Sequence, residues 1–165
     1  MKRTILGILT MAAVSLGSPQ AAQAQQLVSA ANPAALRAQF EAWGYRPGVL
    51  QGADDQPLFE ATIGSVRTVV VLGGCERGRN CNHVVLIATY SDVPNPPYEW
   101  LNRHNFDYNL VTAMRRQDGL LALRSGIMIG PQGVPASALR AAFDDWIAVN
   151  GEIARSATEA GLIRD

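Results

Sequence analysis

Two runs rich in β-branched residues enclose the two cysteines of this 165-residue chain, and this arrangement constrains the fold more than any other feature. The runs are VRTVVVL (66–72) and HVVLIATY (83–90), and the residues between the cysteines, ERGRN, are polar and centred on a glycine. β-branched residues favour strands, whereas a short polar segment with a glycine favours a turn. The segment therefore predicts a β-hairpin that places Cys75 opposite Cys81.

This hairpin has a self-consistent register when the two cysteines face each other. The cross-strand pairs are then Val71 with Val85 and Val69 with Ile87. Apolar side chains meet on the same side of the ladder in this register, as a stable antiparallel pair requires. A disulfide between Cys75 and Cys81 would lock the hairpin and would perform no chemistry of its own.

Other chemistries fit the spacing of this segment less well. A zinc site made of Cys75, Cys81 and His83 would have only three ligands. A redox pair more often has the spacing Cys-x-x-Cys. Gly73 and Gly74 invite comparison with a phosphate-binding loop, but no Gly-Lys-Ser/Thr follows them. We therefore predict a structural disulfide, and neither a metal nor a cofactor.

The first residues of the chain predict export. Lys2 and Arg3 precede an apolar run (5–16), and residues 22–24 supply the small-x-small pattern that signal peptidase reads. The apolar run is shorter than the about 20 residues that a membrane span needs. We expect residues 1–24 to be a signal peptide, and the protein to be periplasmic or secreted without a stable membrane anchor. Cysteines usually pair in such an environment.

The expected mature chain is one domain with little net charge. We expect a flexible leader at 25–31, followed by a single domain at 32–162. Removal of Lys2 and Arg3 leaves 12 basic against 14 acidic side chains. A slightly acidic domain lacks the long-range field that attracts phosphate backbones, so nucleic acid is not an expected partner.

The remaining patterns predict helices and strands in the order α-β-β-β-α-β-β-α. Asn32 with Pro33 predicts a helix start, and Gly44 its end. The expected strands are 58–63, 66–72, 83–90, 106–117 and 120–129, with a short helix at 98–105 and a long final helix that reaches about residue 160. This order predicts an α+β fold in which helices pack on one face of an antiparallel five-stranded sheet.

The last expected hairpin fixes which side chains share a face. A two-residue type I′ turn at Asp118 and Gly119 would join its strands. The core face would then carry Tyr108, Leu110, Met114, Leu121, Leu123, Ile127 and Ile129. The opposite face would carry Val111, Ala113, Ala122 and Met128 with Arg115 and Arg124. That mixture of apolar area and arginine is favoured at protein interfaces, so this face is the predicted partner surface, including a homodimer contact.

Several further segments complete a family pattern. Gly44 and Tyr45 end the first helix ahead of an acidic turn at 54–55, WLNRHNF (100–106) lies near mid-chain, and RRQDGLLAL (115–123) and FDDWIAV (143–149) follow. With the cysteine-bearing strand pair, this arrangement resembles the YbjN family of bacterial proteins over 32–153.

The resemblance to the YbjN family implies a fold similar to type III secretion chaperones, which dimerise and bind extended peptide segments. It also implies a regulatory role in sensory transduction, and it supplies no catalytic residues. Cytoplasmic members lack the export signal expected here.

The sequence offers few candidates for catalysis. His83 and His104 are the only histidines, and a small periplasmic hydrolase using either one is the alternative function. Neither a Gly-x-Ser-x-Gly nor a His-Glu-x-x-His motif is present. Adjacent residues diverge by about 100° on a helix, so Asp144 and Asp145 cannot form a tight dyad.

We therefore expect a non-enzymatic binding, chaperone-like or regulatory module that recognises a protein or peptide partner. Trp100 follows a loop with three prolines and is the tryptophan expected to line a groove. The expected partner-binding residues are Trp100, Val111, Arg115 and Arg124.

Overall fold

The computed structural model describes residues 26–53 and 56–164. The predicted signal peptide, residues 1–24, lies outside this part of the chain, as does the acidic turn at 54–55. Within the described residues, no helix combines the length and the apolar character that crossing a bilayer requires.

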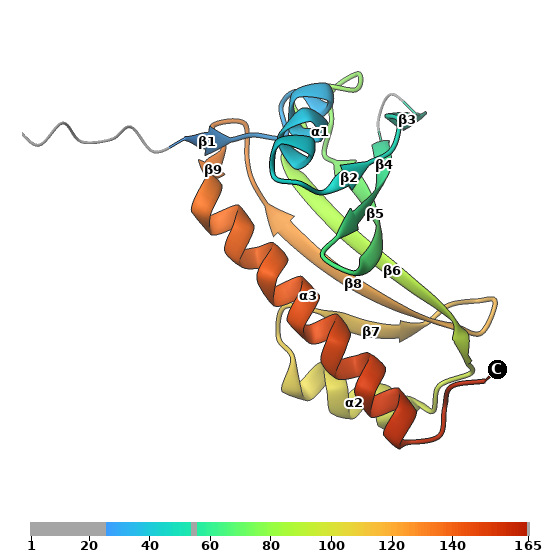
Figure 1. Cartoon of the computed structure of the whole chain (residues 1–165). Coiled ribbons are helices and arrows are strands. Elements are labelled where there is room, and N and C mark those ends of the chain that lie inside the picture. Colours follow the sequence, from blue (N-terminus) through green and yellow to red (C-terminus); the bar gives the residue numbers. More distant parts are fainter. Residues whose placement is uncertain (1–25, 54–55, 165) are drawn as a thin grey trace, which may run out of the picture.

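The protein has an α+β fold built on a seven-stranded, antiparallel sheet (Figure 1). Its strands are β2 (Arg46–Pro47), β3 (Gln51–Ala53), β4 (Gln56–Ile63), β5 (Val66–Gly73), β6 (His83–Pro94), β7 (Thr112–Arg115) and β8 (Leu120–Met128). The order across the sheet is β2-β4-β5-β6-β8-β7, and β3 also pairs with β4. The prediction of five strands was therefore wrong by the two short strands β2 and β3.

The β4–β5 and β5–β6 hairpins form as the sequence predicts. Val71 pairs with Val85 and Val69 with Ile87, which is the predicted register of the cysteine-bearing hairpin. Alternate residues along β5 are buried, with Thr68, Val70 and Leu72 facing the core. The regular alternation places one face of the sheet in the core and leaves the other face toward solvent.

The hairpin of β7 and β8 differs from the prediction by one residue. Its connection has three residues, because Arg116 N–H donates to Leu120 C=O at 2.9 Å and Gly119 N–H donates to Arg116 C=O at 3.0 Å. Gly119 has the predicted positive φ, at 87°. A three-residue connection with glycine at its last position replaces the expected type I′ turn.

The one-residue difference exchanges the faces of β7, because side chains alternate along a strand. Ala113 pairs with Leu123 and is buried against the core, and Val111 is also buried. Leu110, expected in the core, is 67 % exposed. The predicted strand at 106–117 is also shorter, since a helix extends to Asp107 before the strand begins.

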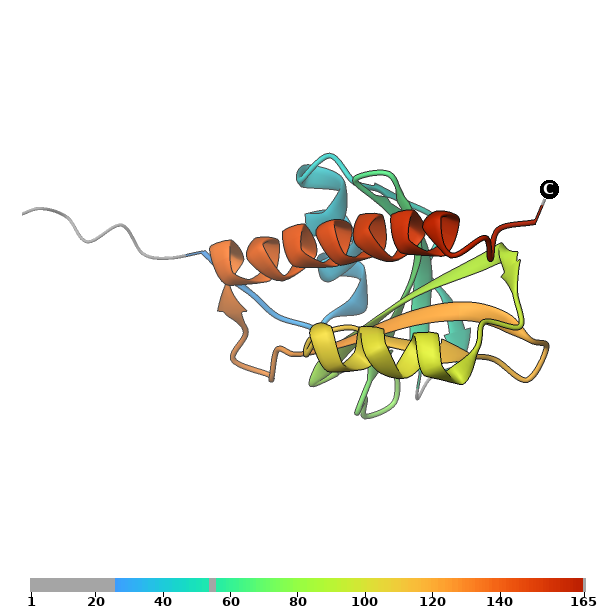
Figure 2. The same ribbon diagram turned by 90° about the horizontal axis from the view of Figure 1, so that it is seen from below.

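Three helices are present among the described residues. They are α1 (Pro33–Ala42), α2 (Tyr98–Asp107) and α3 (Ala136–Glu159). Figure 1 shows α3 running diagonally across one face of the sheet, and Figure 2 shows α2 beside α3. The Asn32 side chain accepts from the N–H groups of Ala34 and Ala35, so the predicted cap of α1 is confirmed.

Aromatic packing joins α1, α3 and the sheet. The Phe40 ring of α1 lies 5.1 Å from Phe59 of β4 and 5.0 Å from Phe143 of α3. The buried indole N–H of Trp146 donates to the hydroxyl of Thr68 at 3.0 Å, which fixes α3 over β5. The core therefore lies between α3, α1 and one face of the sheet.

The edge of the sheet at β7 is closed by a side chain of α2. Asn105 accepts from the N–H of Ala113 at 2.7 Å and donates to its C=O at 3.0 Å. These are the two backbone groups that a further strand would use for pairing. The amide of Asn105 therefore blunts this edge.

The segment expected to be a flexible leader forms structure near its C-terminal end. Strand β1 (Leu27–Val28) pairs with β9 (Val134–Pro135), directly before α3. Val28 is only 4 % exposed, and Ala30 is fully buried. Residues 27–30 are therefore part of the folded domain, which corrects the expectation of a flexible segment.

Candidate functional site

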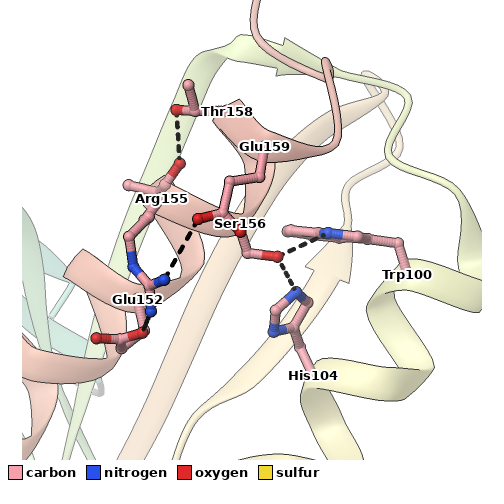
Figure 3. A network of polar contacts seen from close by, with 8 residues as sticks. Trp100, His104, Glu152, Arg155, Ser156, Thr158 and Glu159 are labelled. Carbon is pink, nitrogen blue, oxygen red and sulfur yellow. Dashed lines mark hydrogen bonds and ion pairs between the residues drawn. The ribbon is translucent and has the colours of Figure 1, made fainter.

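A polar contact between α2 and α3 brings a histidine and a serine together (Figure 3). The Nε2 atom of His104 lies 3.0 Å from the hydroxyl oxygen of Ser156, and the indole N–H of Trp100 donates to the same oxygen at 3.3 Å. The rings of Trp100 and His104 meet edge to face, with centroids 4.2 Å apart. These contacts fix the start of α2 against the C-terminal turns of α3.

His104 is held in an environment that favours its neutral form. The residue is buried, and burial lowers the pKa of its ring below 6.5. The ring stacks on Tyr108, with centroids 6.1 Å apart. Its Nδ1 atom is buried and has no hydrogen-bond partner within the described part of the chain. A protonated ring would carry an unsatisfied buried N–H, so the site resists protonation.

The charged residues beside Ser156 form a separate surface network. Arg155 forms ion pairs with Glu152 and with Glu159, one turn away on either side (Figure 3). All three side chains are largely exposed, so these pairs add little to stability. Among the residues that the structure describes, no carboxylate is hydrogen-bonded to Nδ1 of His104.

A shallow groove opens next to this contact, where α2 begins and α3 ends. Its volume is about 270 Å³. The lining residues are Pro97, Glu99, Trp100, Arg103, Ala160 and Leu162. Apolar surface from Trp100 and Leu162 is therefore flanked by one acidic and one basic side chain.

The predicted partner-binding residues do not share one surface. Trp100 lines the groove, as expected. Val111 is buried in the core, and the guanidinium of Arg115 stacks over the ring of Tyr98 at 4.0 Å on the helix side of the sheet. Arg124 alone lies on the opposite side, paired across the ladder with Ile87. The predicted face is corrected because the register of β7 differs by one residue.

The side of the sheet opposite α3 has an apolar centre and charged flanks, and we call it the outer face. Its central residues are Leu58, Glu60, Val69, Val71, Val85, Ile87, Arg124 and Gly126. None of the three described helices packs on it, and Met128 at its margin is 71 % exposed. The outer face is therefore free of helices, although Val85 at its centre is only 6 % exposed.

The outer face is ordered in rows that run across the strands. One row reads Glu60, Val69, Ile87 and Arg124 from β4 to β8. The neighbouring row reads Leu58, Val71, Val85 and Gly126. The first row thus has opposite charges at its two ends. The second row has the large side chain of Leu58 at one end and Gly126, which has no side chain, at the other.

His83 is not part of the α2–α3 contact. Its side chain lies on the side of the sheet opposite α3, directly over Gly73, and its Nδ1 atom is 2.6 Å from the side-chain oxygen of Asn82. His83 and His104 are therefore on opposite sides of the sheet and cannot act as an acid–base pair. Within the described residues, no cluster of three or more potential metal ligands occurs.

The predicted disulfide between Cys75 and Cys81 is present. The loop that it closes turns through left-handed conformations at Arg77, Gly78 and Asn80. The N–H of Asn80 donates to the C=O of Ala31 at 2.8 Å. The disulfide loop therefore also holds the segment that enters α1.

Sequence reasoning missed Ser156 and Asn105. Ser156 lies 52 residues from His104 along the chain, and its position on α3 gives no local signal of a partner. Asn105 lies within the segment WLNRHNF, and its contact with Ala113 depends on where α2 ends. Both roles follow from tertiary packing.

These observations define an α+β fold with one disulfide-locked hairpin, a helix-flanked groove and a sheet face without a helix on it. The family model named YbjN, described as "Putative bacterial sensory transduction regulator", matches residues 32–155. The chain therefore belongs to the YbjN family. No curated protein and no solved structure matches the chain.

Proposed function

We propose that this protein is an exported, non-enzymatic regulatory module that binds an apolar segment of a partner protein. Membership of the YbjN family supports a regulatory role. The proposal is carried by one observation, the groove beside Trp100. Its indole N–H is bound to Ser156, so the ring is presented in a fixed orientation.

The size and lining of the groove favour a protein segment over a small molecule. A volume of about 270 Å³ lies below the about 300–1,000 Å³ that small-molecule sites usually have. A rigid tryptophan surrounded by charged residues resembles the centre of a protein contact, where aromatic anchors carry most of the binding energy. Glu99 and Arg103 supply the polar rim.

An exposed phenylalanine extends this surface along α2. Glu99, Arg103 and Phe106 are spaced by four and three residues, so they lie on one side of the helix. Phe106 is 85 % exposed. A second apolar anchor, one turn beyond Arg103, fits a partner segment that runs along α2 from the groove. Pairing at Ala113 of β7 is not available to such a segment, because Asn105 occupies both backbone groups of that residue.

A peptide-binding experiment tests this site. We expect a random peptide library panned on the protein to yield apolar sequences whose binding is lost in Trp100→Ala and in Phe106→Ser. Val49→Ser is the matched control, since Val49 is 74 % exposed in the connection between β2 and β3. Peptides that bind both α2 variants as well as the parent protein would refute the site.

Export has its own test. The N-terminal pattern and the disulfide support it. We expect the protein recovered from the periplasm or the medium to begin at Gln25 and to be lighter than its reduced form by two hydrogen atoms. Thiol labelling of Cys75 or Cys81 in the unreduced, denatured protein would contradict the pairing in the exported form.

The contact between His104 and Ser156 is the observation that favours a hydrolase instead. A serine hydroxyl 3.0 Å from a neutral imidazole is the first element of a nucleophile–base pair. Such pairs normally have a third group that orients the base and stabilises its protonated form. Within the described residues, the buried Nδ1 of His104 has no such group.

Covalent labelling separates the two functions. We expect a fluorophosphonate probe to leave Ser156 unmodified and p-nitrophenyl esters to be hydrolysed no faster than in buffer. Labelling that disappears in Ser156→Ala, together with ester hydrolysis that is lost in both Ser156→Ala and His104→Asn, would establish the hydrolase and overturn the non-enzymatic proposal.

A further inference from the structure

The outer face has a pattern that matches itself after a half-turn. In its first row, Glu60 and Arg124 lie at the two ends, with Val69 and Ile87 between them. A two-fold axis nearly parallel to the strands, placed between β5 and β6, exchanges β4 with β8 and β5 with β6. A second copy laid face to face then brings its Arg124 over Glu60 and its Glu60 over Arg124.

In the second row, the same axis brings together side chains of complementary size. Leu58 lies at the β4 end and Gly126 at the β8 end, so the half-turn places each leucine over the glycine of the other copy. A Cβ added at Gly126 would have no atom within 4 Å, so the space above this glycine is open. Glycine inside a strand often marks a place where another group approaches closely.

The centre of the face supplies apolar contact, chiefly from the half-buried Val69, Val71 and Ile87, because Val85 is only 6 % exposed. Val71 and Val85 pair across the ladder on this face, as do Val69 and Ile87. The same half-turn places Val69 over Ile87 and Val71 over Val85 of the second copy. Facing sheets pack about 10 Å apart with strands inclined by about 30°. The long side chains of Glu60 and Arg124 can meet across that gap at the margin.

From these three matches, we infer that a second copy of this chain is the occupant of the outer face. The dimer is a two-fold sheet-on-sheet contact in which Glu60 pairs with Arg124 of the partner and Leu58 packs on Gly126 of the partner. Arg67 holds Glu60 at 3.2 Å in the single chain, but both side chains are exposed and that pair is weak. The groove beside Trp100 lies on the other side of the sheet, so this inference does not depend on the proposed function.

Charge exchange gives a test that only this geometry satisfies. We expect the mature protein to sediment as a dimer at micromolar concentration, and Glu60→Arg or Arg124→Glu alone to raise the dissociation constant more than about tenfold by like-charge contact. An equimolar mixture of the two variants restores the dimer, because each arginine of one variant then meets a glutamate of the other. The double variant, with both substitutions in one chain, also restores it.

Two further variants separate the interface from general effects. Gly126→Val fills the open space and should weaken the dimer while circular dichroism shows a folded chain. Arg77→Glu makes the same charge change as Arg124→Glu in the exposed disulfide loop and should leave the dimer intact. A wild-type monomer throughout the micromolar range overturns the inference. A dimer that survives both single charge variants, or single variants that stay monomeric when mixed, overturns it as well.

Discussion

Removing the amide of Asn105 should destabilise the domain by opening the β7 edge. The side chain makes two hydrogen bonds to Ala113, at 2.7 and 3.0 Å. A hydrogen bond contributes about 0.5–1.5 kcal/mol net, and water can reach a strand edge after truncation. We therefore expect Asn105→Ala to lower the free energy of unfolding by about 1–2 kcal/mol. The measurement is urea unfolding followed by circular dichroism.

Asn102→Ala is the matched control for this prediction. Asn102 lies on the same helix and is exposed, so both substitutions raise helix propensity by the same amount. The difference between the two variants then measures the edge contact alone. Amide exchange at Ala113 provides a second readout, since its N–H should exchange faster only in Asn105→Ala. Equal unfolding midpoints and equal exchange in the two variants would refute the role assigned to Asn105.

Three further predictions concern the disulfide, His104 and the last hairpin. Replacing both Cys75 and Cys81 by serine should cost about 2–3 kcal/mol, because the closed loop restricts the unfolded chain; unfolding midpoints unchanged by reductant would contradict this. Burial lowers the pKa of His104 below 6.5, so the unfolded chain takes up this proton first as the pH falls. The stability that depends on neutral His104 is therefore complete above pH 6.5 and is lost as the pH falls through the lower folded pKa. Between about pH 5 and 7, the free energy of unfolding should therefore fall less steeply with decreasing pH in His104→Asn than in the parent protein. Gly119→Val should cost about 1 kcal/mol or more, because its φ is 87° and a Cβ would lie 2.7 Å from the side-chain oxygen of Asn95. An unfolding midpoint of Gly119→Val equal to that of the parent protein, in the same urea unfolding assay, would contradict the explanation.

The sequence was sufficient where local chemistry decides the structure. Asn32 caps α1 through its side chain, and the β-branched runs 66–72 and 83–90 form the strands β5 and β6, as the sequence predicts. The register of the cysteine-bearing hairpin could be predicted because placing Cys75 opposite Cys81 fixes the remaining cross-strand pairs. These features depend on neighbours in the chain.

The faces of β7 could not be predicted, because they depend on a single residue in the turn. Asp118 and Gly119 suit a two-residue turn, but Arg116 rather than Gln117 closes the connection. One residue of register reverses every side chain of a strand, so Val111 moved from a predicted surface to the core. The short strands β2 and β9 have two residues each, too few for any periodic pattern.

The candidate site was predictable in only one of its parts. Trp100 was expected beside a groove because of the proline-rich loop before it, and it lines one. Its partners Ser156 and Leu162 come from the other end of the domain. Such long-range neighbours leave no mark on local composition.

The pairing of β1 with β9 has a consequence for the order in which the domain is completed. Leu27 and Pro135 are paired although 107 residues separate them, whereas each hairpin of the main sheet joins neighbouring segments. Closing a contact between distant segments is slow compared with closing a hairpin. A chain that is released with its N-terminus first can therefore form the β4–β5–β6 meander early. The small β1–β9 sheet must wait until residues 134–135 are released, so the segment before α1 is secured only after all strands of the main sheet have been synthesised.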